Sequence, residues 1–151
     1  MHVRKQIRDA VGTVLTGGTT WDRVFNTRVA PARDVTPYLM VFIDTEAISG
    51  STIHTTAVQE RTMGLNVIGR SRIVEGEALE DALDAMAAEI ETTLTNSALR
   101  TELSNNQVWL TLQSTSSDLQ VEDENDREYA QVSLEYEIRL FTDEYLPETI
   151  V

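Results

Sequence analysis

Apolar residues recur along this chain with two different periods, and each period predicts one kind of element. Over residues 2–16 the apolar positions follow helical spacing and the pair Gly17-Gly18 comes directly after them, which predicts an amphipathic helix that ends there. A second helical stripe lies within residues 75–94 and has acidic residues in its first turn, where the helix dipole favours them. This stripe consists of Leu79, Leu83, Met86, Ile90 and Leu94.

The middle of the chain predicts a pair of strands. Residues 38–44 form a continuous apolar run, which is typical of a strand buried on both faces. We expect residues 45–59 to form a long, flexible hairpin tip before a second strand at 61–74. Gly69, inside that second strand, indicates a β-bulge.

The clearest strand pattern is the last, from about Glu128 to Phe141. Its apolar face would hold Val132, Leu134, Tyr136, Ile138 and Leu140, and its polar face Gln131, Ser133, Glu135, Glu137 and Arg139. Such alternation fits an antiparallel strand with one buried and one solvated face. A strand at 107–113 precedes it, and we expect its Trp109 in the core because apolar residues flank it. Residues 96–106 are expected to be irregular, and 21–29 to be short and β-leaning.

These elements together predict an α+β fold, with a mainly antiparallel sheet of four or five strands and two helices packed on one face. A chain of 151 residues is near the usual size of one domain, so we expect a single domain over residues 1–151. Residues 143–151 are too few to fold alone and end in apolar side chains. They are interpreted as a C-terminal arm that is either frayed or docked on a neighbour.

Charge is distributed unevenly along the chain. The formal net charge is −13, yet residues 1–36 hold six basic against three acidic residues, a net of +3, and the rest hold six against 22, a net of −16. The overall acidity argues against an ordinary nucleic-acid binder, while the asymmetry suits head-to-tail contacts between copies as well as it suits chance clustering. Lys5 is the only lysine among the 12 basic residues, a composition compatible with a salt-rich cytoplasm.

The chain lacks the residues that common catalytic sites need. It has no cysteine, which excludes disulfides and thiolate chemistry, and its only histidines are His2 and His54. The glycines at 12–18 follow a helix and come without the lysine of a phosphate loop, and GRSRI at 69–73 departs from the serine-hydrolase elbow. No apolar run approaches the ~20 residues of a membrane span. We therefore expect neither enzyme activity, nor a cofactor, nor a membrane contact, and expect the protein to act in the cytoplasm or in a particle assembled there.

The acidic stretch at 118–128 is the one candidate metal site. Neither register through it has the glycine and the glutamate that an EF-hand calcium loop requires. A looser divalent-metal site could use Asp118, Asp123 and Asp126, and a metal-binding module or enzyme built on it is one alternative function. A solvated turn leading into the last strand is the preferred interpretation, because acidic runs are usually solvated.

The order of the elements gives a more specific hypothesis. The helix, the short segment RVFNTRVAP, the strand PYLMVFI, the hairpin, the helix ALEDALDAMAAEIE, the Trp-bearing strand and the closing strand AQVSLEYEIRLF together resemble the tail terminator (tail completion) proteins of long-tailed, siphovirus-like viruses. The resemblance spans nearly the whole chain but is one of layout, since the individual motifs are degenerate. Other head-tail connector or neck proteins are the nearest alternative, and a cytoplasmic adaptor remains open.

The resemblance implies a structural virion protein located at the neck of the tail and assembled in the host cytoplasm. Such subunits form a ring, usually a homohexamer, on the head-proximal end of the tail tube, where they end tube growth and present the head-joining surface. The implied partners are other copies, the tail tube protein and the head-tail connector or stopper protein, while genome DNA passes through the lumen without specific binding. Mobile apolar segments tend to order on partners. The residues expected to dock on partners are therefore Ile48, Ile53, Leu146 and Ile150.

Overall fold

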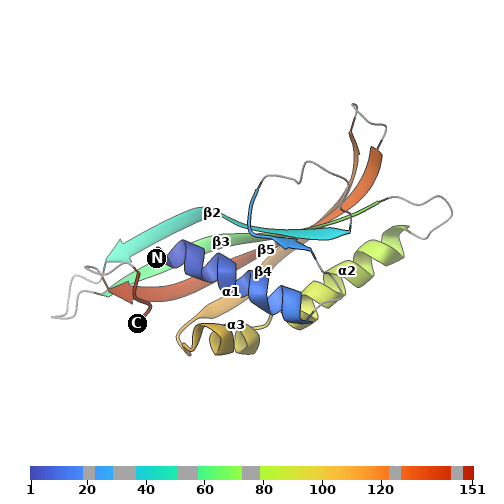
Figure 1. Ribbon diagram of the computed structural model, residues 1–151. Coiled ribbons are helices and arrows are strands. Elements are labelled where there is room, and N and C mark those ends of the chain that lie inside the picture. The colour runs from blue at the N-terminus through green and yellow to red at the C-terminus, as the bar shows by residue number, and fades with distance from the viewer. Residues whose placement is uncertain (19–22, 29–36, 51–57, 73–78, 123–126, 144–147) are drawn as a thin grey trace.

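The computed structural model describes residues 1–18, 23–28, 37–50, 58–72, 79–122, 127–143 and 148–151. Within these ranges, helices and one twisted sheet form an α+β fold (Figure 1). The helices are α1 (Val3–Gly18), α2 (Leu79–Thr93) and α3 (Asn96–Leu103). The strands are β1 (Val24–Phe25), β2 (Tyr38–Gly50), β3 (Val58–Arg72), β4 (Trp109–Glu122) and β5 (Arg127–Asp143). The expected fold class is thus confirmed.

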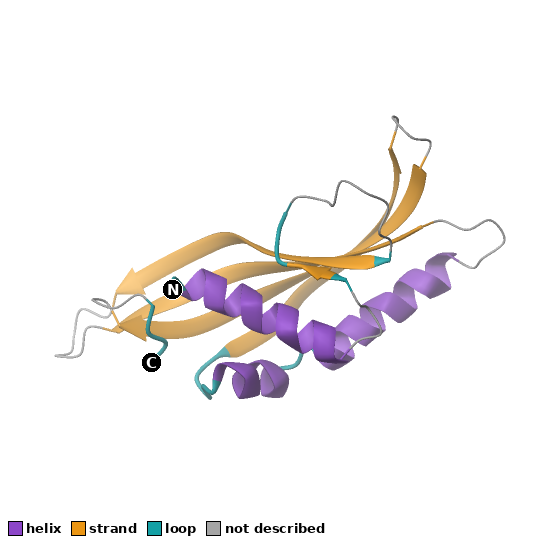
Figure 2. Ribbon diagram, viewed as in Figure 1, coloured by secondary structure: helices purple, strands orange, loops and turns teal. Residues whose placement is uncertain are grey.

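The sheet has the strand order β1-β2-β3-β5-β4 and is mainly antiparallel. Only the short pairing of β1 with β2 is parallel; the β2–β3, β3–β5 and β4–β5 pairs are antiparallel. All three helices lie on one face of the sheet, and the opposite face is open (Figure 2). One lateral border of the sheet is therefore formed by β1 and β2, and the other by β4.

The core lies between the helices and the sheet, and it uses the alternation that the sequence predicted. The apolar residues of β5 that were expected on one face are all buried, and Leu83, Met86 and Ile90 of α2 pack against the sheet. Strand β2 is buried on both faces over Tyr38–Val41, as its continuous apolar run predicted. The helix of residues 2–16 is confirmed as α1.

Helix α3 corrects the expectation of irregular structure at 96–106. Its N-cap is Thr95, whose hydroxyl accepts a hydrogen bond from the Ala98 backbone N–H at 3.2 Å. Its C-cap is Ser104, which has a left-handed backbone with φ of 52°. The helix buries one side chain fully, that of Leu99, so the sequence carries no apolar stripe that would reveal it.

Gly69 does not form the bulge that was expected of it. It pairs in regular register with Leu39 and Val132, and a Cβ added to it would clash with the Met86 sulfur. The absence of a side chain at Gly69 lets α2 approach the sheet closely. The register shifts lie elsewhere, at Asp44 in β2 and at Gln113 in β4.

Two further expectations need correction. Residues 45–50 and 58–59 belong to the paired strands β2 and β3 and are not part of a loop; residues 51–57 lie outside the described ranges.

Trp109 is 41% exposed, while its neighbours Val108 and Leu110 are the buried residues. Because successive strand residues face opposite sides, apolar neighbours in a strand place a residue on the opposite face and not in the core.

Candidate functional site

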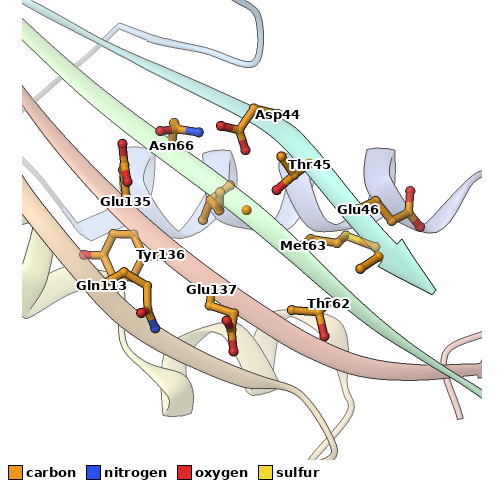
Figure 3. Close-up of a pocket in the computed structure, with 13 residues that line it drawn as sticks. Asp44, Thr45, Glu46, Thr62, Met63, Asn66, Gln113, Glu135, Tyr136 and Glu137 are labelled. Atoms are coloured by element: carbon orange, nitrogen blue, oxygen red, sulfur yellow. The ribbon is translucent and has the colours of Figure 1, made fainter. Parts of the chain in front are cut away.

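The open face of the sheet contains a hollow of about 320 Å³ between the two register shifts (Figure 3). Asp44 and Thr45 border it on β2, Gln113 borders it on β4, and Gly64 of β3 leaves room in the middle. A bulge lets a strand bend and re-aim its side chains, so the two bulges shape this hollow from opposite sides.

Acidic and amide side chains line this hollow. The carboxylates come from Asp44, Glu135 and Glu137, and Asn66 contributes a side chain that is almost fully buried. The hydroxyl of Ser114 donates a hydrogen bond to Glu135 at 3.2 Å. In the ranges that the structure describes, no group of three or more His, Asp or Glu residues is placed to hold a metal ion. The hollow is therefore an acidic surface.

The acidic stretch at 118–128 is mostly strand. Strand β4 continues to Glu122 and β5 begins at Arg127, while residues 123–126 lie outside the described part. The expectation of a solvated turn over the whole stretch is corrected to this extent. Asp118 is an exposed strand residue. Asp123 and Asp126, the other two members of the looser metal site, are not described, and that site stays a prediction.

Arginines gather at the border formed by β1 and β2. The Ile43 backbone carbonyl accepts hydrogen bonds from Arg4 of α1 at 3.1 Å and from Arg28 at 2.6 Å. The Arg28 guanidinium also lies over the Phe42 ring, 5.3 Å from its centroid. Arg8 follows Arg4 by one helical turn, and its buried Nε finds no hydrogen-bond partner among the described residues. The positive charge of the N-terminal segment is thus placed beside the outer edge of β2.

A buried charged network lies near the end of the β2–β3 pairing that is closest to residues 51–57, and sequence reasoning missed it. Arg61 is 4% exposed, forms an ion pair with Glu46 and donates from Nε to the Thr142 hydroxyl at 2.8 Å. Arg4 approaches Glu46 from the other side at 3.7 Å. A signal was present, because Arg61 occupies the same alternate positions as Met63 and Leu65, where β3 is otherwise apolar.

The expected docking residues have different surroundings. Ile48 projects from the outer part of β2 and is 52% exposed, while Ile53 and Leu146 lie outside the described ranges, as does His54. Ile150 is partly buried, forms a bridge with Thr142 and packs against the core of its own chain. Of the two docking residues that the structure describes, Ile48 and Ile150, only Ile48 is exposed enough to contact a partner in this conformation.

The two chain termini meet beside this bridge. The N-terminal ammonium of Met1 forms an ion pair with Glu148, and Gln6 donates to the Glu148 backbone carbonyl at 2.6 Å. The hydrogen bond from the ammonium, and then its charge, hold the pKa of the Glu148 carboxyl below its usual value. Residues 148–151 therefore rest against their own chain and extend the edge of β5.

Comparisons with known proteins place few constraints on the function. No family model and no curated protein matches the chain. Among solved structures, the chain is similar to one from the virion of a native gene transfer agent (GTA) particle, over 91% of this chain and 95% of that chain. The sequence identity is 10% and the TM-score is 0.34, so no argument about function rests on this likeness. No helix in the described ranges is long and apolar enough to cross a membrane.

Proposed function

We propose that this chain is a structural virion protein that forms a ring at the head-proximal end of a tail tube, ends tube polymerisation there and provides the head-joining surface. Its order of elements resembles that of tail terminator proteins, and the described elements follow this order. Six copies per ring is the number that the resemblance implies. We propose no catalytic role for the chain.

The layout of charge across the sheet carries this proposal. Arg4 and Arg28 lie at the border formed by β1 and β2, and Asp118 lies on β4 at the opposite border. Opposite charges on opposite borders favour heterologous, head-to-tail contacts between identical copies, and such contacts close into a ring when the rotation between copies allows it.

The acidic open face supports the same function. A ring on a tail tube must let DNA pass without gripping it, and carboxylates repel phosphate. Asp44, Glu135 and Glu137 line the hollow on the face that no helix covers. We assign this face to the lumen and the helices to the outer wall. The remaining proposed partners are the tail tube protein on one rim and the head-tail connector on the other.

Electron microscopy tests the ring directly. The purified chain, at high protein concentration in physiological and in molar salt, should form closed rings with a central channel. A second test uses particles assembled without this chain, which should have tails of uncontrolled length that do not join heads. Tails of normal length joined to heads would contradict the proposal.

Calorimetry with calcium, magnesium and manganese tests the alternative metal-binding function. We expect no binding at millimolar metal. Tight binding that is lost on replacing Asp118, Asp123 and Asp126 by Asn would favour the metal module instead.

A further inference from the structure

Strand β4 forms one lateral border of the sheet. It is 14 residues long, and among the described residues it pairs only with β5. No charged residue occurs from Trp109 to Ser117. Natural sheets usually protect an exposed edge with charges, prolines or a covering element, because its unpaired N–H and C=O groups attract other strands. The Asn96 side chain of α3 accepts a hydrogen bond from the Leu110 backbone N–H at 2.6 Å and donates one to the Leu110 carbonyl at 2.8 Å, and so caps the start of this edge. From Leu112 to Ser117 the edge has a bulge at Gln113 but neither charge nor proline.

The opposite border of the sheet offers a matching edge. Strand β1 pairs with β2 only at Leu39 and Met40. From Thr45 to Gly50, no described strand lies on the outer side of β2, and residues 47–50 are uncharged. The antiparallel pairings from β2 through β3 and β5 make β4 run opposite to β2. A second copy that continues the sheet in the same orientation therefore brings its β4 antiparallel to this edge.

Each of the two edges displays a large apolar side chain on the helix side of the sheet, apart from Trp109, which lies on the opposite face of β4 from the buried Leu110. Ile48 of β2 is 52% exposed and Leu112 of β4 is 37% exposed. Ile48 lies opposite the buried Arg61, and Leu112 lies opposite the buried Tyr136. Paired residues point to the same face, so both apolar side chains project on the helix side of the sheet. They would meet if the two edges paired.

From these relationships we propose that β4 of one copy adds to the outer edge of β2 of the next copy, with Leu112 of one chain facing Ile48 of the other. This inference rests on the proposed ring and names the surfaces that close it. It assigns Ile48, expected from the sequence to dock on a partner, to a second copy of the same chain. Backbone hydrogen bonds supply the affinity in such strand addition, and side-chain pockets supply the register.

The charges fit the same register. Asp118 follows Leu112 by six residues, and Phe42 precedes Ile48 by six, so antiparallel pairing brings Asp118 to the level of Phe42 and Ile43. Arg4 and Arg28 lie at that level of β2. A two-fold contact between two β4 edges would instead leave Ile48 and these arginines outside the interface.

Cysteine cross-linking tests the contact, since the chain has no cysteine of its own. The full chain carrying both Ile48→Cys and Leu112→Cys is treated with a short bismaleimide at high protein concentration, and each single variant is treated in parallel. Labelling with a monofunctional maleimide confirms that every introduced thiol reacts. We expect covalent dimers and higher oligomers from the double variant and only uncross-linked chains from the single variants.

Each outcome of the cross-linking experiment either supports or overturns the proposed contact between β4 and β2. Cross-linking of Leu112→Cys alone would indicate the two-fold β4 contact and overturn the inference, as would reactive thiols that give no oligomers. Closed rings in the micrographs together with no cross-linking would overturn this contact and leave the proposed function standing. Cross-linked chains that form open filaments without rings would support the contact and count against the terminator function.

Discussion

Arg61 of β3 donates a hydrogen bond from Nε to the Thr142 hydroxyl of β5 at 2.8 Å, and it lies buried opposite Ile48 of the proposed edge. The same guanidinium forms an ion pair with Glu46 of β2. One buried cation thus links three neighbouring strands where the sheet extends toward the hairpin tip.

Replacing Arg61 by methionine should lower the free energy of unfolding by about 3 kcal/mol, because the largely buried Glu46 then keeps only the more distant Arg4 as a partner among the described residues. Urea unfolding measures this loss. The double variant Arg61→Met with Glu46→Leu should recover part of it, since no charge is then stranded. As a control, Arg139→Ala removes a largely exposed pair with Glu60 and should cost less than about 1 kcal/mol. Equal losses for Arg61→Met and Arg139→Ala would contradict this role.

Gly69 and Gly64 give a matched pair of alanine substitutions in β3. At Gly69 the new methyl group meets the buried Met86 sulfur and Leu39, so we expect a loss of about 1–3 kcal/mol from overpacking. At Gly64 it meets the side chains of Asp44 and Thr45, which are exposed and can move. Thermal unfolding should show a lower midpoint for Gly69→Ala and little change for Gly64→Ala. The reverse order would show that α2 does not approach the sheet as described.

Trp109 and Leu110 test the faces of β4. Leu110→Ala removes a buried side chain and should cost about 2–5 kcal/mol of unfolding free energy. Trp109→Ala removes a half-exposed ring that packs edge-on against Phe141, with centroids 6.0 Å apart, and should cost less. Chemical denaturation of the two variants gives the comparison. A larger loss for Trp109→Ala would restore the core position that the sequence suggested.

Tyr136 should make the fold sensitive to alkaline pH. Burial, and then the negative charge of Glu91, raise the pKa of its hydroxyl in the folded chain. Above the ordinary tyrosine pKa of about 10 the unfolded chain loses a proton that the folded chain keeps, so stability present below that pH is lost as pH rises. The Tyr136 hydroxyl also lacks a hydrogen-bond partner among the described residues.

Stability against pH, measured by urea unfolding between neutral pH and pH values above 10, should therefore fall less steeply for Tyr136→Phe than for the parent chain. Near neutral pH the substitution should be close to neutral, since it removes an unsatisfied buried hydroxyl without removing the ring. Parallel alkaline slopes for the two proteins would argue against the buried hydroxyl as the cause.

The spacing of apolar residues was sufficient to predict an element wherever one period ran through the whole element. The stripe of Leu83, Met86 and Ile90 predicted α2, and the alternation from Val132 to Leu140 predicted β5 together with its buried face. These predictions succeeded because an element with one apolar face must bury that face, whatever it packs against. The difference in net charge between the N-terminal segment and the rest of the chain could likewise be determined from the sequence alone.

Tertiary contacts decided what the pattern left open. Trp109 and Leu110 are both apolar, and only the pairing of β4 with β5 sets which of them faces the helices. The sequence around Gly69 predicted a bulge, but the structure shows that this glycine makes room for Met86 of α2. The actual bulges lie at Asp44 and Gln113, and neither position is a glycine that would have predicted a bulge. A strand's own sequence fixes the period of its side chains, but its register depends on neighbours distant in the chain. For the same reason the two edges displaying Ile48 and Leu112 could be recognised only once the strand order was known.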